Sequence, residues 1–224
     1  MEEENDSPDI PPIQKGDKLF VEDHEMVRIV ESTEYAHKDF KTAHFFTYAN
    51  GYKRAGDKLV QIFSENRSPD SIPFALMCVD LVFPIIFLYR QYLELILKDL
   101  ILIGEQVPRT QAPRKEDNLF KTHSFDQLWQ RFSRLLEQIS PPETPQEEEE
   151  REAVRACIME FHGIDPNGDV FRYPVSQRNQ PSFKDKEDMR QLRYINVSHL
   201  AEKMESLGIF FMQVELSFIA HHPL

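Results

Sequence analysis

The hydrophobic pattern of this chain is densest between Ser71 and Gly104. The first half of this segment is apolar at almost every position, and a helix that is apolar all round must be buried. The second half carries Arg90, Glu94 and Lys98, each four residues after the last, which places them in one row on a helix. Charged side chains inside a protein need partners. The pattern therefore predicts a central buried helix whose second half carries a polar row.

Amphipathic patterns on both sides of this segment predict further helices. Apolar residues follow the helical period in residues 44–65, after Ser124, after Thr144, and from about 198 to 221. Ser124 and Thr144 each begin a capping-box pattern, and Pro145 suits the first position of a helix. The sequence thus predicts a helical domain with at least two well-marked helix starts.

The apolar run from Phe74 to Tyr89 raises the question of a membrane span. It contains Asp80 and Pro84 and is shorter than the ~20 apolar residues that a span requires. We therefore expect a buried core helix. Because proline has no backbone N–H, we also expect a kink or a short break just before Pro84.

The pattern changes after Gly163, which we expect to close a helix. The stretch IDPNGDVFRYPVS combines turn residues with a short aromatic strand pattern, and LRYINV gives a second one. These stretches predict a small two-stranded β-ribbon inserted at about 169–197. The acidic segment 1–22 is expected to be disordered, and 23–224 to form a single domain. The fold class is therefore mainly α, a helical bundle with a small ribbon.

Composition narrows the classes of function. The formal net charge of −12 argues against generic DNA binding, which needs an extended basic surface. Cys78 and Cys157 lie within helical patterns and indicate reduced thiols, and the acidic N-terminus is unlike a secretory signal. These features favour a cytoplasmic protein that does not bind membranes. No phosphate-binding glycine loop or metal motif occurs, so we expect no cofactor and no metal.

The polar row suggests one candidate site. If the ribbon folds back over the helix ends, Arg90, Glu94, His123, Arg172 and Tyr173 converge. They would then form a pocket for an anion or a nucleotide, with His123 as proton donor, the two arginines as catalytic cations, and Glu94 and Tyr173 as binding residues. The alternative is a structural network in which Arg90 pairs with a buried carboxylate and Arg172 ties the ribbon to the helices.

A second pattern resembles a calcium-binding loop. Asp165, Asn167 and Asp169 have its opening spacing. Val170 replaces the required glycine, however, and Ser176 stands where a bidentate glutamate is needed. We interpret this stretch as a turn.

Four stretches together resemble a group of poorly characterised bacterial helical proteins among the HEPN-like domains. They are FLYRQYLELILKDL, HSFDQLW, IDPNGDVFRYP and INVSHLAEKM, and the resemblance extends from about Tyr48 to the C-terminus. It implies a helical bundle, a homodimer, and a place in a bacterial defence or toxin–antitoxin system. Many HEPN proteins are metal-independent ribonucleases whose signature is an Arg and a His with four to six residues between them.

Two places in the chain match that spacing and are weaker catalytic candidates. They are Arg155 with His162, and Arg193 with His199. Ala156 and Tyr194 stand where the family usually has a polar residue. The alternative for each pair is an exposed arginine and a histidine near a helix end.

Two hypotheses for function follow. In the first, the chain is an HEPN-like component of a bacterial defence or toxin-type system that acts as a homodimer on RNA or a nucleotide. In the second, it is a non-catalytic helical module that binds a partner protein or an effector. A solvent-reachable cluster of Arg and His would favour the first hypothesis. A buried and fully paired polar row would favour the second.

Overall fold

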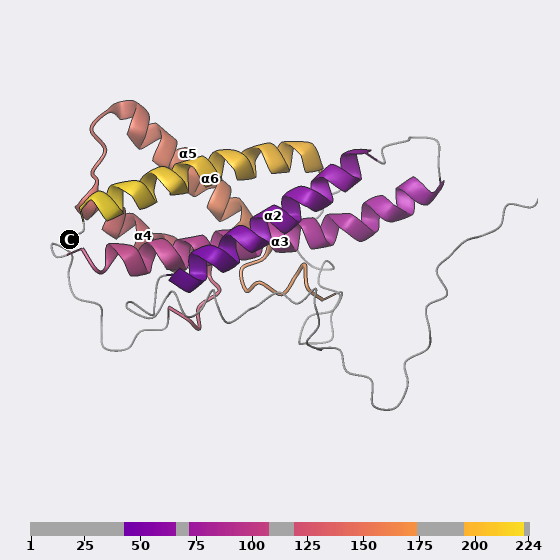
Figure 1. Cartoon of the computed structure of the whole chain (residues 1–224), viewed down its shortest axis with the longest axis horizontal. Coiled ribbons are helices and arrows are strands. Elements are labelled where there is room, and N and C mark those ends of the chain that lie inside the picture. The colour runs from indigo at the N-terminus through magenta and orange to yellow at the C-terminus, as the bar shows by residue number, and fades with distance from the viewer. Residues whose placement is uncertain (1–42, 66–71, 108–118, 174–194, 222–224) are drawn as a thin grey trace, which may run out of the picture.

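The computed structural model describes residues 43–65, 72–107, 119–173 and 195–221, and it is mainly helical there (Figure 1). No strand occurs among these described residues. The helices in chain order are α2 (Ala43–Glu65), α3 (Ile72–Gly104), α4 (Phe125–Ile139), α5 (Pro145–Ile164) and α6 (Val197–Ala220).

Helix α3 is the central element. Figure 1 shows α2 lying along α3 and running in the opposite direction. The two helices approach closely at Gly56, where an added Cβ would lie 2.9 Å from the Tyr89 ring. Next to this crossing, the Tyr89 hydroxyl donates a 2.8 Å hydrogen bond to Asp57. Close packing and a polar tie therefore fix α2 against the middle of α3.

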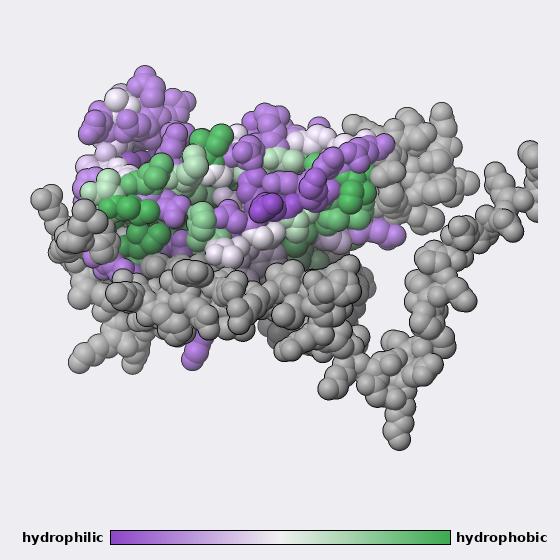
Figure 2. Space-filling view, viewed as in Figure 1, coloured by the Kyte–Doolittle hydropathy of each residue, from purple (hydrophilic) through white to green (hydrophobic). Residues whose placement is uncertain are grey.

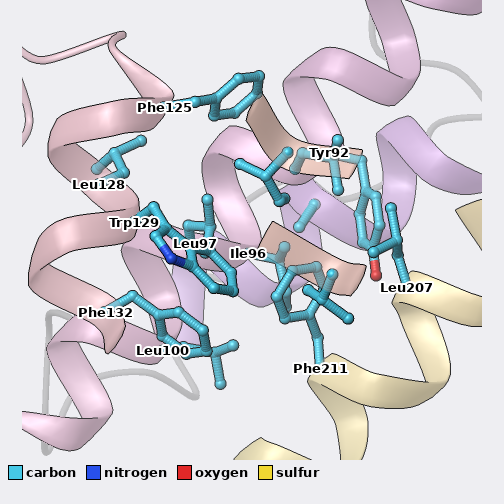
Figure 3. Packing of buried hydrophobic residues seen from close by; sticks show 14 of the residues in the cluster. Tyr92, Ile96, Leu97, Leu100, Phe125, Leu128, Trp129, Phe132, Leu207 and Phe211 are labelled. Carbon is cyan, nitrogen blue, oxygen red and sulfur yellow. The ribbon is translucent and has the colours of Figure 1, made fainter. Parts of the chain in front are cut away.

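The second half of α3 is buried between α4 and α6. Figure 3 shows Trp129 and Phe132 of α4, and Phe211 of α6, directed toward Leu97 and Leu100 of α3. The Phe132 and Phe211 rings meet edge to face, with centroids 6.1 Å apart. This contact joins α4 to α6 across the core. The most deeply buried apolar side chains include Ile85, Tyr89, Leu93, Leu97, Leu100, Ile101, Phe125, Phe132, Phe211 and Phe218.

The expected helix bounds agree closely with those observed. The helix starts differ from one another in their caps. Thr144 accepts a hydrogen bond from the Glu147 N–H at 3.3 Å, so this predicted cap is confirmed. At Ser124 the side chain makes no cap hydrogen bond. The Gln127 side chain, which would complete the box, instead forms a 2.8 Å hydrogen bond with Thr122. The capping box predicted there is therefore wrong, although the helix begins where expected.

Two other expectations change. Helix α3 continues through Pro84, so the short break is wrong, and the alternative of a kink stays a prediction. Both Pro84 and Asp80 are exposed, so the carbonyl that loses its partner can bond to water. Helix α5 ends at Ile164 and is capped by Asp165, one residue beyond Gly163.

The predicted β-ribbon and the terminal segment are described only in part. Residues 170–172 form turns rather than a strand. Residues 174–194 and the predicted disordered segment 1–22 lie outside the described residues, so the ribbon stays a prediction. No helix in the described ranges combines the length and the apolar character needed to cross a membrane.

We predict opposite effects of the same substitution at two glycines of α2. Gly51→Ala should raise the free energy of unfolding by about 0.5–1 kcal/mol, because Gly51 has open space around it and alanine favours a helix. Gly56→Ala should lower it by about 1–2 kcal/mol, because the new methyl group meets the buried Tyr89 ring. Urea denaturation of both variants measures the difference. Equal effects at the two positions would contradict the close approach of α2 to α3.

Candidate functional site

Arg90 lies at the centre of the polar row and is fully buried. Its Nη1 donates to Glu94 Oε2 over 2.9 Å, one turn along α3. Its Nη2 donates over 2.8 Å to the carbonyl oxygen of His123, just before α4. The Arg90 Cζ atom also lies over the Phe125 ring, 4.7 Å from its centroid. Arg90 therefore binds the start of α4 with a charged hydrogen bond and a cation–π contact.

The same side chain holds the end of α5. Arg90 Nε lies 3.0 Å from Asp165 Oδ2, and the backbone carbonyl of Asp165 lies 3.4 Å from both Nε and Nη2. The other carboxylate oxygen of Asp165 accepts hydrogen bonds from the backbone N–H groups of Asp169 at 2.9 Å and Val170 at 3.2 Å. The sequence DPNGD is thus a turn held by its first aspartate, which confirms that interpretation.

Gly168 allows this turn to lie directly on Arg90. Its φ of +79° falls in the left-handed region that favours glycine. A Cβ at this position would lie 2.8 Å from Arg90 Nη1 and 2.9 Å from Cζ. Backbone conformation and space therefore both require glycine at this position.

The charges of the row balance one another. Glu94 Oε1 accepts a 2.7 Å hydrogen bond from Lys98 Nζ, and Lys98 is also buried. Two buried cations, Arg90 and Lys98, thus face two buried carboxylates, Glu94 and Asp165. Burial alone would raise the pKa of Glu94, but Lys98 and Arg90, with His123, outweigh it and lower that pKa. Glu94 is therefore an ionised member of a neutral buried network.

His123 is the solvent-facing end of this network. Its Nδ1 lies 2.9 Å from Glu94 Oε1, while about half of its side chain is exposed. An ionised carboxylate only accepts hydrogen bonds, so Nδ1 carries the proton. The ring borders an open polar pocket of about 370 Å³, lined by Lys121, Thr122, His123, Ser124, Gln127 and Asn167.

The structure brings together part of the predicted site. Arg90, Glu94 and His123 form one network, whereas Arg172 is exposed and stacks on the Phe87 ring, 5.5 Å from its centroid. Tyr173 is exposed beside it, with its ring centroid 5.9 Å from the Arg172 guanidinium. In the described part of the chain, the Arg172 guanidinium contacts these two rings, whereas the carboxylates paired with Arg90 are those of Glu94 and Asp165.

The weaker candidates are not joined to one another in the described part of the chain. Arg155 is exposed on α5, with its Nη1 3.7 Å from a carboxylate oxygen of Glu152. His162 is half-buried near the end of the same helix, and its Nδ1 has no hydrogen-bond partner. His199 is exposed in the first turn of α6, and its backbone N–H donates to the Asn196 cap. Arg193 lies outside the described residues.

An apolar groove lies between the end of α5 and the start of α6. It has a volume of about 360 Å³, and its polar members are Cys157, Glu160, Asn196, His199 and Lys203. Burial and the charge of Glu160 raise the pKa of the Cys157 thiol, which outweighs the opposite effect of Lys203. The apolar members are Ile86, Phe161, Ile164, Phe171, Ile195, Leu200, Met204 and Leu207.

Asp99 is a buried carboxylate that the sequence analysis missed. Neither of its oxygens makes a hydrogen bond with standard geometry, although the backbone N–H of Phe46 favours its charged form. Burial and the charge of Glu215 outweigh that N–H and raise the pKa of Asp99 to about 7. The available signal was a lone acid at the start of the apolar run DLILIG. Asp165 was noted only as a turn residue, because its pairing with Arg90 spans 75 positions.

Comparison of the chain with protein-family models, curated proteins and solved structures gives no match. The resemblance to HEPN-like domains therefore stays a prediction.

We predict that Arg90→Ala lowers the free energy of unfolding by about 3–5 kcal/mol, because it removes the cation paired with buried Asp165 and one of the two buried cations paired with Glu94. Arg172→Ala should cost only about 0.5–1 kcal/mol, the value of an exposed cation–π contact. Thermal and urea denaturation measure both variants. Similar losses for the two variants would mean that Arg172 belongs to the buried network.

We predict that Asp99→Asn stabilises the protein increasingly as the pH rises. In the folded protein Asp99 keeps its proton up to pH of about 7, whereas the unfolded chain releases it near its ordinary pKa. The free energy of unfolding therefore falls by roughly 1.4 kcal/mol per pH unit between about pH 4 and 7. It does not recover above that range. Urea denaturation at several pH values should show that the Asn variant escapes this loss.

The control for this substitution is Asp80→Asn on the exposed face of α3, which measures the effect of the amide on the helix itself. An advantage of Asp99→Asn that stayed the same from pH 4 to pH 8 would contradict the raised pKa.

Proposed function

We propose that this chain is a non-catalytic helical module that binds a partner protein, and that the groove between α5 and α6 receives an apolar segment of that partner. One observation carries the proposal: the polar row that suggested chemistry is buried and neutral. Arg90 has no exposed surface, and its contacts connect α3, the start of α4 and the end of α5. A phosphate group cannot reach its guanidinium without unpacking the helices.

The groove supports binding rather than covalent chemistry. Its walls are mainly apolar and its few polar groups lie among them, which is typical of binding sites. Cys157 is the thiol that lines it. A thiol with a raised pKa stays protonated at neutral pH and is a poor nucleophile. The groove is therefore suited to holding apolar side chains.

Lys203 and Glu160 add a polar component to this surface. Both line the groove, and both belong to exposed positions of their helices. These opposite charges favour one chain direction of a bound segment over the reverse, because charged groups of the segment must lie next to groove residues of opposite charge. The proposal therefore specifies a partner segment with apolar anchors and at least one charged side chain.

The second candidate function is action on RNA or a nucleotide, as in an HEPN-like protein of a bacterial defence or toxin-type system. The Glu94–His123 pair is the observation that favours it. A buried ionised carboxylate orients the half-exposed imidazole, which leaves Nε2 to exchange a proton with a ligand in the polar pocket. Lys121 is the cation that lines this pocket.

We predict that the dye 8-anilinonaphthalene-1-sulfonate, a probe of apolar sites, binds the groove of the folded protein. Leu200→Gln should weaken the saturable fluorescence increase about tenfold, because it places a polar amide on the apolar wall. Leu59→Gln is the matched control, since Leu59 is a partly buried leucine of α2 outside the groove. Equal titrations for the wild type and Leu200→Gln would contradict the groove as a binding surface.

The same preparation decides between the two functions. Incubated with single-stranded RNA and with nucleoside triphosphates, the wild-type protein should leave both intact. Cleavage that His123→Ala abolishes, with unchanged thermal stability, would reject a non-catalytic module and support the second candidate.

A further inference from the structure

Two helix faces form the walls of the groove between α5 and α6 (Figure 1). The residues that line it recur every three or four positions along each helix, which selects one face of each. On α6 they extend over about three turns, and on α5 over about two. The α6 wall and its cap contribute Asn196, His199, Leu200, Lys203, Met204 and Leu207, and the α5 wall contributes Cys157, Glu160, Phe161 and Ile164.

Each wall is supported from outside the groove. Helix α5 packs mainly on α4, whereas α6 packs on α3 and α2. The groove has a volume of about 360 Å³, near the lower end of the range for ligand sites. That volume holds a few side chains but not a whole helix or strand. An occupant therefore lies along the opening and inserts the side chains of one of its faces.

The walls offer an occupant few backbone groups. Most of the lining residues lie within helices, where each N–H bonds to the carbonyl four residues earlier. An extended segment needs backbone partners, as when a strand joins the edge of a sheet. Without them it would place its own N–H and C=O groups against apolar side chains, at a cost in free energy. A helix bonds these groups internally, so the groove favours a helix over a strand.

The two walls differ in charge. Among the residues that line the groove, Lys203 on α6 is positively charged and Glu160 on α5 is negatively charged. Both affect the pKa of the Cys157 thiol, in opposite directions, so both charges lie near the same stretch of the groove. Lys203 pairs at 3.4 Å with Glu202, its exposed neighbour in the chain, and such a surface pair leaves its charge available to a ligand.

The rest of α5 adds to the negative charge of its side. The helix contains six glutamates and two arginines. Figure 2 shows hydrophilic residues gathered where the first turns of α5 project from the bundle. The α5 side of the groove is therefore acidic, whereas the α6 side presents a cation.

We infer that the partner presents an amphipathic α-helix of about three turns, with an acidic residue on the flank that faces α6 and a basic residue on the flank that faces α5. This inference rests on the proposed function, in which the groove is the binding surface. The apolar anchors of such a helix recur at positions such as i, i+4 and i+7. A helix bound in the reverse direction would turn its acidic flank toward Glu160, so the charges also determine its direction.

Selection from a library of random peptides tests this inference. Peptides of about 16 residues, long enough for four turns, are displayed on phage and selected on the full chain. The enriched sequences should share apolar residues three or four positions apart, with an acidic residue on one flank and a basic residue on the other. A synthetic copy should gain helical circular dichroism on binding, and Leu200→Gln should weaken its binding about tenfold. Enriched sequences with alternating apolar residues or an internal proline, or no sequence that Leu200→Gln weakens, would overturn the inference.

The charged flanks have a test of their own. Lys203→Glu should weaken binding of the enriched peptide about tenfold, and replacing the acidic residue of the peptide with lysine should restore most of the loss. Lys58→Glu on α2 is the matched control, because Lys58 is also exposed and the substitution changes the net charge of the chain equally. Equal weakening by the two substitutions would assign the effect to the net charge of −12 and overturn the assignment of the flanks.

The dye titration separates this inference from the proposed function. Dye binding that Leu200→Gln does not affect would reject the groove as a binding surface, and both proposals with it. Dye binding that Leu200→Gln weakens, with no helical peptide enriched, would reject only the helical partner.

Discussion

The pairing of one buried guanidinium group holds three helices in place. Arg90 is on α3, but its partners include the carbonyl of His123 before α4 and both the carbonyl and the carboxylate of Asp165 after α5. A buried arginine with an unmet charge would be costly, so the ends of these helices cannot shift independently. The network thus fixes the positions of the start of α4 and the end of α5 on α3. Apolar packing alone would tolerate small shifts of these helices along one another.

The fold and the candidate site differ in how far the sequence reveals them. The helices were predictable because their signals are local: periodic apolar residues, the Thr144 cap and the proline after it. The polar row of α3 was also predictable, since four-residue spacing places its members on one face. Its structural role could be stated as an alternative, because charges on a buried helix need partners.

The identity of those partners could not be predicted. Asp165 meets Arg90 across a large sequence separation, and no local pattern marks such a pair. Arg172 was expected to join the site, but it stacks on Phe87 one turn away along α3. The capping box predicted at Ser124 does not form, and the Gln127 side chain bonds to Thr122 instead. In each case the decisive contact depends on the arrangement of elements in space.

The turn at Gly168 links positions that are distant in the sequence. Its backbone has room for no side chain because the guanidinium of Arg90 occupies that space. A shorter residue at position 90 would open the space that now excludes a Cβ, but the left-handed backbone at position 168 would still favour glycine. In a set of related sequences, an arginine at position 90 should therefore always occur with a glycine at position 168, whereas the glycine can persist where position 90 differs. An arginine at the first and a glycine at the second would identify chains that share this helix junction, even where the surface residues have diverged.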